Sequence, residues 1–147
     1  MKVLAVASAG GHWVQLLRLS HAFEGHELIY ISTKAGFGSM VEGHEFHLIQ
    51  DSNRKNKFGL IKTFAQVVKL VAKIKPELII TTGAAPGLMC IVAGRVLGIR
   101  TVWIDSIANV EELSMSGKIA AKVAHVVYTQ WPDLAKGRIK YSGNILS

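Results

Sequence analysis

The stretch Lys2–His12 reads KVLAVASAGGH, a short apolar run that breaks into a glycine turn. Apolar residues at a helical spacing, Trp13, Leu16 and Leu17, follow at once. A buried strand, a tight turn and the N-terminus of a helix therefore succeed one another. Such a turn directs free backbone N–H groups and the positive end of a helix dipole at one point, which favours a phosphate or a carboxylate group. His12 lies beside that point.

The glycines of this turn do not identify the ligand. Gly10 and Gly11 are adjacent, whereas the dinucleotide fingerprint requires three glycines in the spacing G-x-G-x-x-G. The G-K-[ST] sequence of a P-loop is also absent. Two interpretations stay open: an anion-binding turn of unassigned type, or a tight connection that binds nothing.

Strand-like and helix-like stretches alternate along the whole chain. We expect strands over 2–7, 27–32, 45–50, 77–81, 100–104 and 125–129, and helices over 12–23, 57–75, 86–97 and 115–123. Strands separated by helices indicate right-handed crossovers and a parallel sheet. The sequence therefore predicts one α/β domain over 1–147, with a Rossmann-like parallel sheet flanked by helices. Ligands of such sheets bind at the carboxyl ends of the strands.

A second strand-to-helix turn is expected at Thr82–Gly87, which reads TGAAPG. Pro86 suits the first turn of the following helix, where its missing N–H costs nothing. Two helix N-termini then face the same edge of the sheet, which favours an anionic ligand there. The loop at 51–56 also lies at this edge. Its Asp51, Arg54 and Lys55 either contact such a ligand or form an ordinary solvated loop.

The composition excludes several classes of protein. The net charge of +7 indicates attraction to an anionic partner, but no nucleic-acid-binding motif accompanies it. The sequence has no apolar run long enough for a transmembrane helix, and its histidines lack the spacing of a metal site. Cys90 lies in an apolar helical stretch, so we expect a buried free thiol and a reducing cytoplasm.

The helix expected over 57–75 has a broad apolar face and a narrow stripe of Lys62, Gln66, Lys69 and Lys73. This pattern is typical of a helix lying on a membrane surface. It equally fits a helix packed on the sheet with its lysines in solvent. His12 likewise has two interpretations: a neutral imidazole that acts as general base toward a hydroxyl, or a contact to a phosphate or to the helix start.

Four motifs together resemble one family, the acceptor-side subunit of two-component glycosyltransferases. The family typically has S-x-G-G-H after a strand, a T-G-x-x-P-G loop, E-S-x-x-R followed by L-S-x-T-G-K, and Q-W-P-x-L. These correspond to Ser8–His12, Thr82–Gly87, Asp105–Lys118 and Gln130–Leu134. This chain departs from the pattern in three places, with Asp105 for Glu, Asn109 for Arg and Ser116 for Thr.

The resemblance implies the N-terminal half of a GT-B fold and a subunit of an inverting glycosyltransferase that is inactive alone. Its expected partners are a lipid-pyrophosphate-linked sugar acceptor, a separate subunit that binds the UDP-sugar, and the inner face of the membrane. Its expected pathway is capsule, exopolysaccharide or oligosaccharide-lipid synthesis, with no resident cofactor or metal. His12 would be the catalytic base. The residues expected to hold the acceptor pyrophosphate are Ser8, Gly10, Gly11, Arg54, Thr82, Gly83, Gly87, Asp105 and Ser106. Those expected at the partner interface are Ser116, Lys118, Gln130 and Trp131.

Two functions from other classes remain open. The chain is alternatively a non-catalytic scaffold that recruits the donor-binding subunit to the membrane. It is otherwise a stand-alone nucleotide-binding domain, although the third fingerprint glycine is missing.

Overall fold

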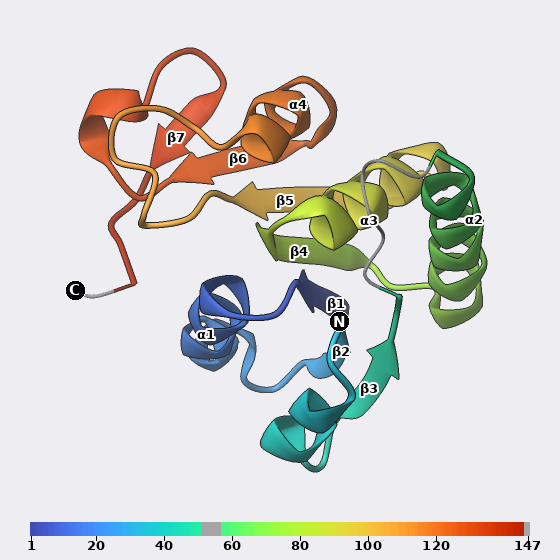
Figure 1. Ribbon diagram of the computed structural model, residues 1–147. Coiled ribbons are helices and arrows are strands. Elements are labelled where there is room, and N and C mark those ends of the chain that lie inside the picture. The colour runs from blue at the N-terminus through green and yellow to red at the C-terminus, as the bar shows by residue number, and fades with distance from the viewer. Residues whose placement is uncertain (51–56, 146–147) are drawn as a thin grey trace.

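The computed structural model describes residues 1–50 and 57–145. In this part of the chain, seven parallel strands form one sheet in the order β3-β2-β1-β4-β5-β6-β7 (Figure 1). The strands are β1 (Lys2–Ala7), β2 (Glu27–Ser32), β3 (Glu45–Leu48), β4 (Leu78–Gly83), β5 (Arg100–Ile104), β6 (Val126–Thr129) and β7 (Ile139–Tyr141). The helices are α1 (Gly11–Arg18), α2 (Lys57–Ile74), α3 (Ala85–Val96) and α4 (Met115–Val123). Three 3₁₀ segments are η1 (Ser20–Phe23), η2 (Ala35–Val41) and η3 (Pro132–Leu134). The predicted Rossmann-like α/β fold is confirmed.

Helices cover both faces of the sheet because the strands are apolar on both sides. On β1, Leu4 and Val6 face a core that α2, α3 and α4 complete, whereas Val3 and Ala5 face a second core beneath α1 and η2. The period of two along the strand separates the two sets. β1, β2 and β4 each contribute residues to both cores, so these strands separate the two layers.

The structure departs from the expected elements in a few places. The helix expected over 12–23 ends at Arg18 and gives way to η1. The segment η2 lies in an expected loop, where Phe37 stacks on Trp13 with 4.8 Å between the ring centroids. The strand β7 was not predicted, since its three residues contain no apolar run and it forms by pairing with β6.

Helix α2 packs on the sheet through Val67, Val71 and Ile74, which are buried in the larger core. The alternative that this helix packs on the sheet is therefore confirmed for its second half. Its first turns differ, because Phe58 is 86% exposed and Ile61 is 67% exposed. Within the described ranges, no helix combines the length and apolar character needed to cross a bilayer.

Candidate functional site

The two predicted turns meet at the point where the strand order reverses. The chain proceeds from β1 to β2 and β3 on one side, then returns to place β4 on the other side of β1 and continues to β7. The loops after β1 and β4 therefore leave their strands in opposite directions, and a crevice at this point is where ligands of open α/β sheets bind. The two loops are joined directly, since the backbone N–H of Ser8 donates to the carbonyl of Gly83 at 2.9 Å.

Two hydrogen bonds between His12 and Thr82, together called the clasp, join the two turns. The His12 Nδ1 lies 2.9 Å from the carbonyl oxygen of Thr82, and the Thr82 hydroxyl donates to the carbonyl oxygen of His12 at 2.6 Å. Because a carbonyl oxygen only accepts, Nδ1 carries the hydrogen of the neutral ring. The other nitrogen, Nε2, then holds the lone pair of a potential base.

Gly83 is required for this clasp. Its φ of +115° is rarely adopted by residues with a side chain, and a Cβ placed there would lie 2.8 Å from His12 Nδ1. Gly87 serves packing instead, because a Cβ at that position would overlap the Thr81 hydroxyl. The T-G-x-x-P-G loop therefore uses one glycine to admit the imidazole ring and the other to seat α3 on β4.

The N-cap residues of α1 and α3 are Gly10 and Ala84, and within residues 1–50 and 57–145 neither helix start has a side-chain cap hydrogen bond. Gly10 and Gly11 are exposed, and a Cβ on either would meet no atom within 4 Å. Backbone N–H groups at such helix starts bind anions well. Both starts lie at the same sheet edge as His12.

Asp105 is buried within its own loop. It is 2% exposed, and its carboxylate accepts hydrogen bonds from Trp103 Nε1 at 3.0 Å, Asn109 Nδ2 at 3.1 Å, and both the N–H and hydroxyl of Ser114, at 3.0 and 2.7 Å. Ser114 in turn accepts from the N–H of Gly117 and caps α4. The structure therefore gives Asp105 a role in fixing the loop at 105–114.

Ser106 also lies inside, at 8% exposed, where its hydroxyl accepts from Gln15 Nε2 and the N–H of Ala108. Arg54 lies outside the described residues, as do Asp51 and Lys55. Of the two turns, the first exposes Gly10 and Gly11, whereas Thr82, Gly83 and Gly87 of the second are buried. Acceptor binding by these residues stays a prediction.

The four residues expected at a partner interface separate into two groups. Ser116 and Gln130 are buried within this chain, at 6% and 3% exposed. Lys118 is exposed and pairs with Glu112 at 2.8 Å, which lowers the pKa of that carboxyl through the hydrogen bond and the lysine charge. Trp131 is half-buried and donates from Nε1 to the carbonyl of Ile107 at 2.7 Å. A partner contact stays an expectation for Lys118 and Trp131.

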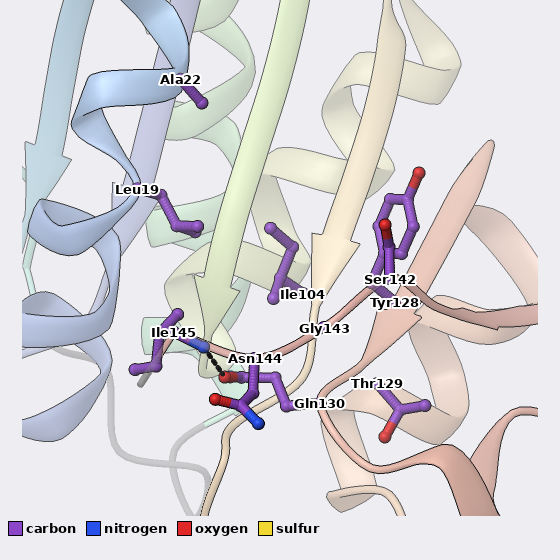
Figure 2. Close-up of a pocket in the computed structure, with 10 residues that line it drawn as sticks. All are labelled: Leu19, Ala22, Ile104, Tyr128, Thr129, Gln130, Ser142, Gly143, Asn144 and Ile145. Atoms are coloured by element: carbon purple, nitrogen blue, oxygen red, sulfur yellow. Dashed lines mark hydrogen bonds between the residues drawn. The ribbon is translucent and has the colours of Figure 1, made fainter. Parts of the chain in front are cut away.

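An apolar cavity of about 380 Å³ lies beside Gln130, on the face of β5 and β6 toward η1 (Figure 2). Its lining includes Leu19 and Ala22 from the segment after α1, Ile104 of β5, Tyr128 of β6, and the segment 142–145. The sequence pattern gave no signal of this cavity. Among residues 1–50 and 57–145, no group of His, Cys, Asp and Glu is arranged to hold a metal ion.

Comparison with solved structures identifies the fold. MurG from Acinetobacter baumannii superimposes with a TM-score of 0.79 at 16% identity, over 97% of this chain and 45% of that one. The UDP-GlcNAc 2-epimerase from Neisseria meningitidis superimposes with a TM-score of 0.73 at 9% identity, over 98% of this chain and 46% of that one. This chain thus spans less than half the length of either protein. The predicted likeness to the N-terminal half of a GT-B glycosyltransferase is confirmed.

Comparison of sequences identifies the family. The profile of the family described as "Oligosaccharide biosynthesis protein Alg14 like" matches residues 44–145. The protein named UDP-N-acetylglucosamine transferase subunit ALG14 from mouse is 28% identical, over 99% of this chain and 83% of the relative. Its human counterpart is 25% identical over the same shares. The chain belongs to the Alg14-like family of oligosaccharide biosynthesis proteins.

Proposed function

We propose that this chain is the acceptor-side subunit of a two-component inverting glycosyltransferase that is inactive without its donor-binding partner. The name of its relatives, UDP-N-acetylglucosamine transferase subunit, supports a transferase complex and makes N-acetylglucosamine the first sugar to test. The observation that carries the proposal is the His12–Thr82 clasp between two uncapped helix starts at the switch point of the sheet.

In the proposed reaction, the helix starts at Gly10 and Ala84 hold the pyrophosphate of a lipid-linked sugar acceptor. His12 Nε2 accepts the proton of the acceptor hydroxyl as its oxygen attacks the anomeric carbon of the donor sugar. The bond from that carbon to the UDP oxygen breaks, UDP leaves with the electron pair, and the anomeric configuration inverts. The nucleotide is held by the partner subunit. The product serves oligosaccharide-lipid, capsule or exopolysaccharide synthesis.

The substitution His12→Asn separates the base from the clasp. The Asn amide can still donate to the carbonyl of Thr82, as Nδ1 does, but it has no counterpart of the Nε2 lone pair. We expect turnover by the reconstituted subunit pair to fall about 10²–10⁴-fold, the usual contribution of a general base, while partner binding persists. The control is His21→Ala, since the His21 side chain is 86% exposed. Turnover of His12→Asn close to that of the control would favour the alternative in which the chain is a non-catalytic scaffold.

The exposed start of α2 supports peripheral contact with a membrane. Phe58 and Ile61 protrude there beside the exposed Lys57 and Lys62. Apolar side chains flanked by lysines bind anionic bilayers by insertion and charge attraction together.

Sedimentation with vesicles rich in phosphatidylglycerol tests this contact. We expect Phe58→Ser/Ile61→Ser to abolish binding. The control is Val96→Ser, because Val96 is 72% exposed at the far end of α3. Equal binding of both variants would place the membrane contact elsewhere.

A further inference from the structure

Gln15 is a buried polar side chain on α1, only 7% exposed, and every polar atom of its amide has a partner. Its Nε2 donates to Ser106 Oγ at 3.0 Å. Its Oε1 accepts from the N–H of Ile107 at 3.1 Å and from Gln130 Nε2 at 2.7 Å. Since the N–H of Ile107 can only donate, the orientation of the amide is fixed.

Gln130 continues the network on the other side. Its Nε2 donates to both Gln15 and the carbonyl of Asp105, at 2.7 and 2.9 Å. Its Oε1 accepts from the N–H of Ile145 at 3.1 Å, the bond drawn in Figure 2. The two glutamines thus join α1, the loop after β5, the end of β6 and the segment 142–145 that lines the apolar cavity.

This network reaches the candidate base through a short helix. Helix α1 has eight residues, has no side-chain cap and begins at an exposed glycine, so its position depends on tertiary anchors. His12 lies three positions before Gln15, about one helical turn away and on the same side. His12 ties this helix to the turn after β4, and Gln15 ties it to the loops after β5 and β6.

We propose that Gln15 is a positioning residue that holds His12 in its clasp with Thr82 by anchoring α1 to Ser106, Ile107 and Gln130. The proposal rests on the proposed function in one respect, because it takes His12 as the base. In this proposal, the D-S pair at 105–106 and the Q-W-P motif at 130–132 supply two partners of Gln15, namely Ser106 and Gln130.

Two substitutions of Gln15 test this proposal, since one removes the hydrogen bonds of its amide and the other retains acceptors for them. Gln15→Leu keeps the volume but leaves the N–H of Ile107 without its acceptor. Gln15→Glu retains an acceptor for Ile107 and for Gln130, and its second oxygen accepts from the Ser106 hydroxyl after a rotation. The matched control is Gln66→Leu, because Gln66 is exposed on α2.

The first readout is the ¹⁵N spectrum of the His12 ring in the isolated chain, which requires neither partner nor substrate. We expect the Nδ1–H tautomer in the wild type, in Gln66→Leu and in Gln15→Glu, and a mixture of tautomers in Gln15→Leu. A pure Nδ1–H tautomer in Gln15→Leu would overturn the proposal. If Gln15→Leu does not fold, Ser106→Ala is used instead. It removes only the hydroxyl that accepts from Gln15 Nε2 and from the N–H of Ala108. An unchanged His12 spectrum in Ser106→Ala equally overturns the proposal.

The second readout is kinetic and uses the reconstituted pair. We expect Gln15→Leu to lower kcat about 10- to 100-fold, the scale of a slight misplacement of a reacting group, with the KM for the nucleotide sugar unchanged. Gln15→Glu should restore most of kcat. A loss of melting temperature with unchanged kcat would show a merely structural role and overturn the proposal. If no partner supports transfer, the proposed function fails, whereas the spectrum still decides the role of Gln15.

Discussion

Removing the Asp105 carboxylate should lower the stability of the protein, because the group accepts hydrogen bonds from buried and part-buried donors. Trp103 Nε1 and the N–H of Ser114 both donate to it, and neither group can act as an acceptor instead. Trp103 is 1% exposed, so water cannot readily replace the carboxylate there. In Asp105→Ala each of these donors loses its acceptor, at about 1–3 kcal/mol apiece. The Ser114 cap of α4 also loses the bond that orients its hydroxyl.

The two orphaned donors therefore lower the free energy of unfolding of Asp105→Ala by about 2–6 kcal/mol, and the weakened cap adds about 1 kcal/mol to this loss. Asp105→Asn retains one oxygen, so it serves about half of the four donors and should lose about 1–3 kcal/mol. The assay is urea-induced unfolding of the purified chain followed by tryptophan fluorescence.

The matched control is Asp133→Ala, since Asp133 is exposed in η3. A surface substitution of this kind changes stability by at most about 0.5 kcal/mol. If Asp105→Ala and Asp133→Ala unfold at the same urea concentration, the carboxylate does not hold the loop. That result would favour the expected role of Asp105 as a contact of the acceptor.

Three other predictions concern stability and reactivity. Gly87→Ala should destabilise the chain by about 1–3 kcal/mol through overlap with the Thr81 hydroxyl, and adding Thr81→Ala should recover part of this in chemical unfolding. Desolvation, and then three nearby arginines, lower the pKa of His125 below its ordinary 6.5. The unfolded chain therefore binds a proton more readily than the folded chain, and stability should fall as the pH drops below 6.5. In His125→Gln, the melting temperature should depend less on pH. Burial raises the pKa of Cys90 to about 12, so Ellman's reagent should label it at pH 8 only after denaturant is added.

Much of the fold is predictable because the strands carry their signal locally. The apolar runs at β1, β2 and β5 predict bounds that agree with the structure. A short edge strand such as β7 carries no such signal, because two of its three side chains are exposed and pairing alone defines it. The glycine-rich segment η2 likewise takes its shape from Phe37, which stacks on Trp13 across the core. Tertiary contacts, rather than local preference, determine these two elements.

The candidate site is likewise only partly predictable from the sequence, because some of its groups are defined locally and others depend on their neighbours. Each turn is recognisable from its glycines, but their adjacency follows from the strand order at β1 and β4, which no local pattern specifies. A polar residue after a strand can face a ligand or serve its own loop, and only its hydrogen bonds distinguish the two. The carboxylate of Asp105 and the amide of Gln130 make their hydrogen bonds within this chain.

Among the described residues of the two turns, we propose that the backbone N–H groups at the starts of α1 and α3 bind the anion, because His12 Nδ1 donates to Thr82 and Nε2 carries a lone pair. Alanine substitutions of polar side chains leave such backbone groups in place, so a conventional alanine scan would miss the proposed anion site. The informative substitution is Gly10→Ala. The φ of +89° at Gly10 strains any residue with a side chain, although the space around it is open. A loss of pyrophosphate binding in Gly10→Ala, with His12 and its clasp intact, would therefore locate the anion on the backbone of the first turn.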